Sequence, residues 1–479
     1  MTSETPNLTK PDTAPDETQP GRAGSFALDI ERRGIVDSFR DYTFRLRTGE
    51  PGALPSVLGI VVLSVIFYQV SDRFLTKNNV GNLPSQGAYI AVIALGLVFV
   101  LLLGEIDLSA GTAGGMCAAF AGDAIFTGNL HNSIPGLLYW SLLIGMIAAA
   151  AAAVWLRAYS GAVVIAVGAV IIGTNETKHV VLALIAAVCI GAAAGVLNGV
   201  LVAKVGIPSF VVTLALFLAW QGVLKYAITG QPINVSNYDF WDNLTQSNMS
   251  PAWSWVFSIV LVGGYLAYSI MKSLRARARG LAHDAMSLVL LRTGAIAVVA
   301  LVVTYLANQN RNTNTFKIIE GIPYAAVIPI VLMIICTIAL GKTTWGRHLM
   351  ATGGNAEAAR RAGIDVVHVR VTAFIICSSF GALGGVLLAS SSHAVSLDLG
   401  AGNILLFSVA AAVIGGTSLF GGRGKPRDAI IGALVITIIP NGLGLRPSIP
   451  DQNQVIITGG VLLVAAAIDA LTRRRSRIR

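Results

Sequence analysis

Residues 86–104 read QGAYIAVIALGLVFVLLLG and contain no charged side chain. An α-helix rises about 1.5 Å per residue, so a run of this length nearly crosses the ~30 Å hydrocarbon core of a bilayer. In the whole chain of 479 residues, 54% are hydrophobic and only 12% are charged, whereas soluble domains carry about 25% charged residues. The run is too long and continuous for a strand of a membrane barrel, and backbone groups in lipid must be hydrogen-bonded internally. It therefore predicts a membrane-spanning helix and an all-α fold.

Similar runs recur along the chain and predict a polytopic bundle of about 12 to 14 transmembrane helices within residues 51–472. The candidate spans are residues 53–70, 86–104, 107–127, 134–156, 158–174, 180–203, 209–228, 253–271, 285–306, 322–340, 369–390, 404–420, 428–445 and 455–471. The weakest are the run 158–174 and the break at 104–107, which is barely long enough for a turn. A total of twelve would make two weak segments half-helices or re-entrant.

Lysine and arginine predict which loops face the cytoplasm, because loops rich in these residues stay there. Loops 229–252 and 391–403 contain neither residue. Basic loops alternate with loops that lack lysine and arginine, and this order places both termini in the cytoplasm. The same distribution explains the net charge of +10 without a nucleic-acid partner. The basic loop residues are Lys272, Arg275, Arg277, Arg279, Lys342, Arg347, Arg360, Arg361, Arg370, Arg423, Lys425 and Arg427.

The two ends of the chain differ from the rest. Residues 1–50 have four prolines in the first twenty positions and no apolar run, which predicts a disordered cytoplasmic tail. No cleavable signal peptide is visible, so we expect the first span to direct insertion. Residues 473–479 form a basic cytoplasmic tail. The four cysteines lie in apolar runs, and we expect neither a disulfide nor a metal site.

Residues 104–111 (GEIDLSAG) place two carboxylates between hydrophobic runs, where each charge would cost ~2.5 to 3.5 kcal/mol at the bilayer centre. Glu105 and Asp107 could line a wet path in a broken helix and accept hydrogen bonds from a ligand. Equally, Asp107 could cap a helix that begins at Leu108, with both acids at the interface. The residues leave both interpretations open. Nearby glycines favour close helix packing, and they are Gly111, Gly114 and Gly115.

Residues 353–364 (GGNAEAARRAGI) have the order of a complete short helix in a basic loop. Asn355 suits the N-cap, an acid follows in the first turn, and Gly363 suits the left-handed stop. Two turns do not hold in water unaided, so we expect a docking piece for another protein; a helix packed on its own membrane domain is the alternative. The residues of this predicted helix are Gly354, Asn355, Glu357, Arg360, Arg361, Gly363 and Ile364.

Residues 415–424 (GGTSLFGGRG) are rich in glycine, which favours a bent or re-entrant segment over a rigid helix. The Gly-x-x-x-x-Gly-Lys-Ser/Thr spacing of a phosphate-binding loop is absent here. The closest approach is Gly341-Lys342-Thr343, where Cys336 takes the place of the first glycine. We therefore predict that the chain has no ATPase activity of its own.

Together these segments resemble the membrane permease subunits of bacterial ABC importers for monosaccharides, the ribose, galactose and xylose group. The resemblance covers residues 53–471. Glu105 and the long region 229–320 look most like the xylose permease subunit. Residues 134–203 depart from the pattern, because they hold three candidate crossings where similar permeases have about one; we expect an extra helical pair. The matching blocks are 105–109 (EIDLS), 208–214 (PSFVVTL), 353–360 (GGNAEAAR) and 414–419 (IGGTSL).

The resemblance implies a non-enzymatic, multi-pass subunit of the bacterial inner membrane, without a cofactor, that works by alternating access. It implies a cytoplasmic ATP-binding subunit docked at residues 353–364, a periplasmic sugar-binding protein on the outer face and a second permease copy. Because the binding protein supplies affinity, the sugar path needs only a few hydrogen-bonding groups. The best candidates for that path are Glu105, Asp107, Ser109, Thr417, Ser418 and Asn441.

Two other classes of protein compete with this interpretation. In an ion-coupled secondary sugar transporter, Glu105 and Asp107 would carry protons or sodium, and no ATPase would be needed. A membrane-embedded enzyme would need a nucleophile and base or a set of metal ligands, and no such constellation is visible.

Overall fold

The computed structural model describes residues 32–33, 54–280, 283–311, 318–446, 448–450, 452–460 and 463. Nearly all of the two predicted tails, and the second half of the last predicted span, lie outside the described residues. The chain forms two compact units. One unit comprises residues 1–41 and 261–297, and the other, which contains every site discussed below, comprises residues 42–260 and 298–479.

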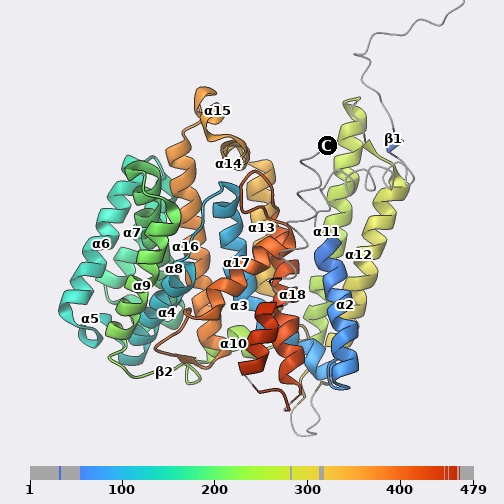
Figure 1. Ribbon diagram of the computed structural model, residues 1–479, viewed down its shortest axis with the longest axis horizontal. Coiled ribbons are helices and arrows are strands. Elements are labelled where there is room, and N and C mark those ends of the chain that lie inside the picture. The colour runs from blue at the N-terminus through green and yellow to red at the C-terminus, as the bar shows by residue number, and fades with distance from the viewer. Residues whose placement is uncertain are drawn as a thin grey trace, which may run out of the picture. The chain divides into compact units, whose positions relative to one another are not determined.

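Helices make up almost all of the described part (Figure 1). In that part, nine helices are long and apolar enough to cross a membrane: α3 (Lys77–Leu102), α6 (Gly136–Trp155), α8 (Val180–Val200) with the turn that follows it, α9 (Ser209–Ala227), α11 (Pro251–Ala278), α12 (Met286–Ala307), α13 (Tyr324–Lys342), α16 (Val366–Ser391) and α18 (Pro426–Gly444). Four other apolar helices are α2 (Leu54–Val70), α4 (Ala110–Thr127), α7 (Tyr159–Gly173) and α17 (Asn403–Gly415). The prediction of an all-α polytopic membrane protein is confirmed, and the total number of crossings stays a prediction.

The remaining elements are short. They are α5 (Leu130–Ser133), a 3-10 turn (Glu176–Lys178), a π-helical turn (Leu201–Val205), α10 (Asp239–Gln246), α14 (Thr344–Gly354) and α15 (Ala356–Arg361). In the first unit, β1 (Arg32–Arg33) pairs in parallel with β3 (His283–Asp284). In the second, β2 (Ile233–Asn234) pairs antiparallel with β4 (Ala394–Val395). Residues 452–460 are also helical.

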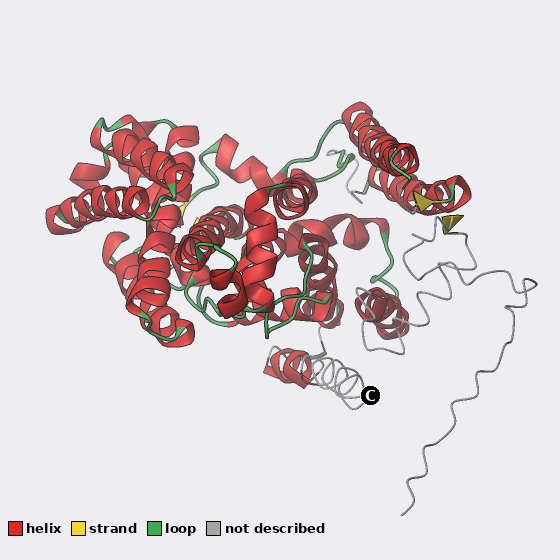
Figure 2. Cartoon of the chain, turned by 90° about the horizontal axis from the view of Figure 1, so that it is seen from above, coloured by secondary structure: helices red, strands yellow, loops and turns green. Residues whose placement is uncertain are grey.

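Helix α16 lies at the centre of the second unit, where it packs on α3, α4 and α8. Figure 2 shows many of the described helices end-on. Glycine lets the backbones of these helices come close together. A Cβ at Gly114 of α4 would collide with the backbone of α16 at Gly381, and one at Gly385 would collide with Gly114. On α8, three glycines spaced four apart face α16 in the same way. They are Gly191, Gly195 and Gly199. The predicted helix-packing role is confirmed for Gly114, whereas Gly111 and Gly115 lie against the backbone of Gly400 and Leu399, in the loop before α17.

The outer helices of this unit expose large apolar side chains. Helix α6 packs on α7 and α8, and α9 packs on α4. Leu137 and Trp155 of α6 are 80% and 65% exposed, which suits a surface that faces lipid. Residues 134–203 thus contain the three predicted helices, with α8 in the core and α6 and α7 outside it.

Figure 1 places α14 and α15 at one end of the second unit, and β2 and α10 at the opposite end. The first end carries the basic loop 343–365, and the second carries the loops 229–252 and 391–403, which contain no lysine or arginine. Helix α10 closes that second end. The indole Nε1 of Trp241 donates to the carbonyl of Val386 (2.9 Å), and Asp242 lies 2.7 Å from Nδ1 of His393.

Two predicted boundaries are wrong for local reasons. Helix α3 begins nine residues before the expected position 86, because Thr76 caps it by accepting a hydrogen bond from the amide of Asn79. Helix α17 ends at Gly415 rather than at residue 420, because Gly416 adopts a φ of 127°. Side-chain-bearing residues avoid that conformation.

Candidate functional site

The break predicted between two spans is longer than a turn, since α3 ends at Leu102 and α4 begins at Ala110. Gly104 has a φ of 76°, which ends the helix. Oδ1 of Asp107 accepts hydrogen bonds from the amide (2.8 Å) and the hydroxyl (2.7 Å) of Ser109, the N-cap residue of α4. Asp107 therefore satisfies donors just before α4, but the helix begins at Ala110 with Ser109 as its N-cap, not at Leu108 with Asp107 as its cap, as the capping interpretation expected.

Asp107 and Ser109 also meet a third polar residue, Asn198 of α8. Its Nδ2 donates to Oγ of Ser109 (3.0 Å) and to Oδ2 of Asp107 (3.4 Å). All three residues are 0% exposed. The thiol of Cys377, on α16, contacts the same carboxylate. Three membrane helices thus meet at one buried carboxylate, which we call the Asp107 cluster (Asp107, Ser109, Asn198 and Cys377).

Glu105 does not join the Asp107 cluster. Its Oε1 lies 3.3 Å from Nε of Arg370, near the start of α16, with an orientation that makes this an ion pair rather than a hydrogen bond. Both side chains are mostly buried, 16% exposed for Glu105 and 27% for Arg370. The pair joins the break after α3 to the helix at the centre of the fold.

The glycine-rich segment 416–425 forms the loop between α17 and α18, and it packs against the break after α3. The amide of Gly422 donates to the carbonyl of Leu102 over 2.8 Å. The prediction that this segment is bent is confirmed, since Gly416, Gly421, Gly422 and Gly424 all have positive φ.

Thr417 and Ser418 are buried at the base of this loop. The hydroxyl of Thr417 has no hydrogen-bond partner among the described residues. Ser418 donates its amide to the carbonyl of Arg423 (2.8 Å), and its hydroxyl accepts from the amide of Phe420 (3.2 Å). Ser418 therefore holds the loop, while Thr417 offers an unused polar group.

The predicted segment 353–364 also contacts the break after α3 and the loop 416–425. A Cβ at Gly353, in α14, would collide with the carbonyl of Leu102 and lie 3.2 Å from the amide of Gly422. The break after α3, α14 and the loop 416–425 thus meet backbone to backbone. We call this contact the glycine junction (Leu102, Gly353 and Gly422).

The short helix predicted from residues 353–364 is present as α15, and its caps are those expected. Oδ1 of Asn355 accepts from the amide of Ala358 (2.9 Å), and Gly363 has a φ of 83°. Glu357 pairs with Arg360 (2.9 Å) and Arg361 (3.2 Å). Gly354 differs from the prediction, because it ends the preceding helix α14 rather than starting α15.

Helix α15 has two faces. Ala359 is buried and Ile364 packs on the core cluster that contains the end of α3. The side chains of Arg360 and Arg361 are 63% and 80% exposed. One face therefore rests on the membrane domain, while the charged face is free to contact another protein.

Asn441, the last predicted path residue, lies far from the others. Its Nδ2 donates to Oδ1 of Asn79 (2.9 Å) and to Oε1 of Gln86 (3.0 Å), in the first turns of α3. Asn79 and Leu102 are separated by about 35 Å along that helix. Five of the six predicted path residues are therefore at the end of the unit that carries α15, and Asn441 is near the opposite end.

Sequence reasoning did not predict the partners of Arg370, Cys377 or Asn198. A signal existed for Asn198, since an amide inside an apolar run must find a partner. The ion pair of Arg370 had no such signal, because the sequence placed it only in a basic loop.

These features define a membrane transport permease. Residues 157–466 match the family model described as "Branched-chain amino acid transport system / permease component", and the chain belongs to that family. It is a multi-pass protein of the bacterial inner membrane. Helix α6 precedes the matched region, and α7 lies within it.

Three relatives match over most of their length. The chain is 29% identical to the xylose transport system permease protein of Escherichia coli over 422 residues, which cover 88% of this chain and 92% of the relative. It is 28% identical to the protein of the same name from Haemophilus influenzae, covering 90% and 100%. It is 25% identical to the ribose import permease protein of Escherichia coli, covering 86% and 92%. No solved structure matches. The predicted resemblance to monosaccharide permeases is confirmed.

Proposed function

We propose that this chain is the permease subunit of an ATP-driven importer that moves a monosaccharide, xylose or a similar pentose or hexose, by alternating access. The relatives named for xylose and ribose transport support this proposal, since they match over 86–90% of the chain. The family description supports the coarser role of a transport permease. In this proposal the chain itself is not an enzyme, and a separate subunit hydrolyses ATP.

In the proposed arrangement the chain crosses the membrane 12 to 14 times with both termini in the cytoplasm, and α14 and α15 face inward. The distribution of charge supports this orientation. Lys342 and Arg370 flank α14 and α15, and Arg347 lies within α14, whereas the loops 229–252 and 391–403, which contain β2 and β4 at the opposite end, have no lysine or arginine. That opposite end is then the surface for a periplasmic sugar-binding protein.

One observation carries the proposal: the exposed charged helix α15 follows α14, which contacts the membrane domain backbone to backbone. A cytoplasmic ATP-binding subunit would dock on Arg360 and Arg361. Its movement would pass through Gly353 to Leu102 and Gly422. Contacts between backbones cannot be relieved by rotating a side chain, so such a junction transmits displacement rather than absorbing it. A second permease copy would complete the importer.

We place the inner gate of the sugar path at the Asp107 cluster and the adjoining loop. Asp107, Ser109 and Thr417 are 0% exposed, so sugar could reach them only after this end opens. Because a neutral sugar gives the membrane potential no charge to act on, opening must be driven mechanically through the glycine junction. Asn441, with Asn79 and Gln86, would offer hydrogen bonds near the outer end of the path.

Vesicle transport tests this function. The full chain is reconstituted with its ATP-binding and sugar-binding partners, and uptake of labelled xylose and ribose is followed. We expect uptake that needs ATP hydrolysis and persists when an uncoupler collapses the ion gradients. Uptake that survives ATP depletion and stops with the uncoupler would overturn the proposal in favour of the ion-coupled transporter.

A further inference from the structure

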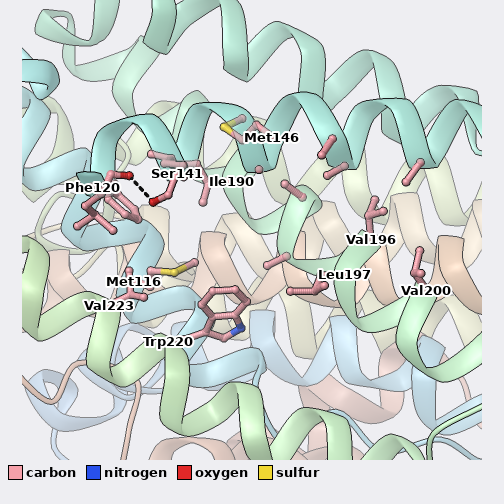
Figure 3. Close-up of a pocket in the computed structure, with 18 residues that line it drawn as sticks. Met116, Phe120, Ser141, Met146, Ile190, Val196, Leu197, Val200, Trp220 and Val223 are labelled. Carbon is pink, nitrogen blue, oxygen red and sulfur yellow. Dashed lines mark hydrogen bonds between the residues drawn. The ribbon is translucent and has the colours of Figure 1, made fainter. Parts of the chain in front are cut away.

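A groove of about 440 Å³ lies between α6 and the helices α4, α8 and α9 (Figure 3). It is separate from the Asp107 cluster and the glycine junction. Its walls are almost entirely apolar and include the small residues Gly145, Ala149 and Ala193. The hydroxyl of Ser141, which also lines the groove, is occupied by a hydrogen bond to the carbonyl of Leu138 (2.9 Å). The groove therefore offers its occupant mainly dispersion contacts and apolar burial, and one donor, the indole Nε1 of Trp220, which has no hydrogen-bond partner among the described residues.

The dimensions of the groove exclude a protein helix. On α6 the lining runs from Leu138 to Ala152, which is about 21 Å at 1.5 Å per residue. A helix of this length, ~10–12 Å wide with its side chains, would occupy several times the groove's volume of about 440 Å³. A single hydrocarbon chain, whose carbon atoms approach the walls to ~3.5–4.0 Å, needs far less space and suits this narrow groove. The groove, at about 21 Å, is longer than the thickness of one leaflet of the hydrocarbon core, which is ~15 Å.

The end of the groove on the side of α15 carries positive charge. Val200 and Ala152 are the last lining residues of α8 and α6 at this end. One turn beyond Val200, Nζ of Lys204 lies 5.0 Å from the ring centroid of Trp155. Arg157 follows two residues after Trp155 and is exposed. An aromatic ring with lysine and arginine at the end of a membrane helix is typical of the level of lipid headgroups.

We propose that this groove binds one acyl chain of an anionic phospholipid, with the phosphate at Lys204 and Arg157. The apolar walls and the narrow width select a hydrocarbon chain, and the two cations select a negative headgroup. The lipid would join α6 to α4, α8 and α9 along a seam where protein atoms leave space. Each methylene group of the acyl chain that packs in the groove adds to the binding free energy. Affinity should therefore depend on the length of the acyl chain as well as on the charge of the headgroup.

The test uses the purified full chain in vesicles of phosphatidylcholine that contain a small fraction of phosphatidylglycerol with a photoactivatable diazirine on one acyl chain. After illumination, labelled residues are mapped by mass spectrometry. We expect adducts concentrated on groove residues of α6 and α8, and competition by unlabelled phosphatidylglycerol but only weakly by phosphatidylcholine. Ala149→Phe fills the groove and should abolish these adducts. Ile147→Phe, on the exposed face of α6, is the matched control and should keep them.

The headgroup contact has its own variants. Lys204→Gln should weaken the preference for phosphatidylglycerol about fivefold, as expected for one juxtamembrane cation. Lys225→Gln, in the last turn of α9 at the opposite end of the unit, should leave the preference unchanged. Adducts spread evenly over exposed apolar residues of the wild-type chain would overturn the proposal, even if Ala149→Phe fails to fold. Equal competition by both lipids would overturn the assignment of an anionic headgroup.

Discussion

The amide of Gly422 and the carbonyl of Leu102 form a hydrogen bond of 2.8 Å that joins the loop before α18 to the last turn of α3. Gly353 packs against the same carbonyl from α14. Three segments that are about 70 to 320 residues apart in the sequence therefore meet at one peptide group. A displacement of α14 cannot leave the other two in place, because close-packed interiors have little room to deform.

Gly353→Ala should uncouple the importer. The new Cβ collides with the Leu102 carbonyl, and backbone on both sides must shift, at ~1–3 kcal/mol for overpacking. We expect the complex to hydrolyse ATP while sugar uptake falls strongly in proteoliposomes. Gly354→Ala is the matched control, since its Cβ would meet nothing within 4 Å. Equal uptake by the two variants would show that the junction does not transmit movement.

Exchanging the charges of α15 separates docking from folding. Glu357→Arg combined with Arg360→Glu retains an ion pair at the same spacing, but it replaces the pair with Arg361 by a like-charge contact and opposes the helix dipole, so the helix should lose ~1–2 kcal/mol. The charged face is reversed, and we expect the ATP-binding subunit to be lost from the purified complex. The control exchanges a pair of similar spacing at the 3-10 turn, by Glu176→His combined with His179→Glu. This control should leave the complex intact. Retention of the subunit by the α15 variant would exclude docking there.

Asn198→Ala should destabilise the membrane domain. The change removes the donor to Oδ2 of Asp107 and Oγ of Ser109, and a buried acceptor left without its donor costs ~1–3 kcal/mol. We expect a lower thermal unfolding midpoint in detergent. An unchanged midpoint would mean that water or another group replaces the amide.

Asp107→Asn distinguishes a gate from a cap. The amide oxygen still accepts the hydrogen bonds from Ser109, while the amide nitrogen in place of Oδ2 loses the bond from Asn198, at ~0.5–1.5 kcal/mol. If Asp107 contributes to the gate, sugar flux should fall at constant protein level. Flux equal to wild type, with the protein correctly inserted, would reduce this residue to a cap for α4.

The Glu105–Arg370 ion pair can be measured by a double-mutant cycle. Glu105→Gln and Arg370→Gln should each lower the unfolding midpoint, and the double variant should lose less than the sum, with a coupling of ~0.5–3 kcal/mol. We expect a measurable coupling because both side chains are mostly buried, so that water screens the ion pair only in part. Strictly additive losses would show that the two residues act independently.

Gly385→Ala tests the central packing of the fold. A Cβ at this position collides with the backbone of Gly114, so we expect separation of α4 from α16 and a fall in folded yield. Gly222→Ala in α9, where a Cβ meets nothing within 4 Å, should instead be neutral or gain ~0.5–1 kcal/mol from helix propensity. A folded yield that does not differ between the two variants would contradict the role of Gly385.

The sequence predicts the helices and the caps of α15 because both depend on local order. Apolar runs fix the spans, and the positions of Asn355 and Gly363 relative to the short run between them fix a two-turn helix. The bend at residues 416–424 was predictable for the same reason, since glycine at that density favours positive φ.

The long-range contacts could not be predicted in this way. Nothing in the order of residues says that Gly353 meets Leu102, or that Asn441 lies about 35 Å from the break after α3. The predicted path residues were grouped by chemistry, and the fold separates Asn441 from the other five. The partners of Glu105 and Asp107 come from α16 and α8, which are distant in sequence, so pairing required the tertiary structure.

The π-helical turn at residues 201–205 ends α8. Such a turn takes in one residue more than an α-turn, which offsets the following side chains by roughly 100° around the axis. Upstream, Gly195 and Gly199 press on α16; within the widened turn, Lys204 points outward to Trp155. The middle of α8 must keep its glycines against α16, but the widened turn lets the end of the same helix point a charged side chain away from the core. One helix can therefore contact both the protein interior and the level of the lipid headgroups.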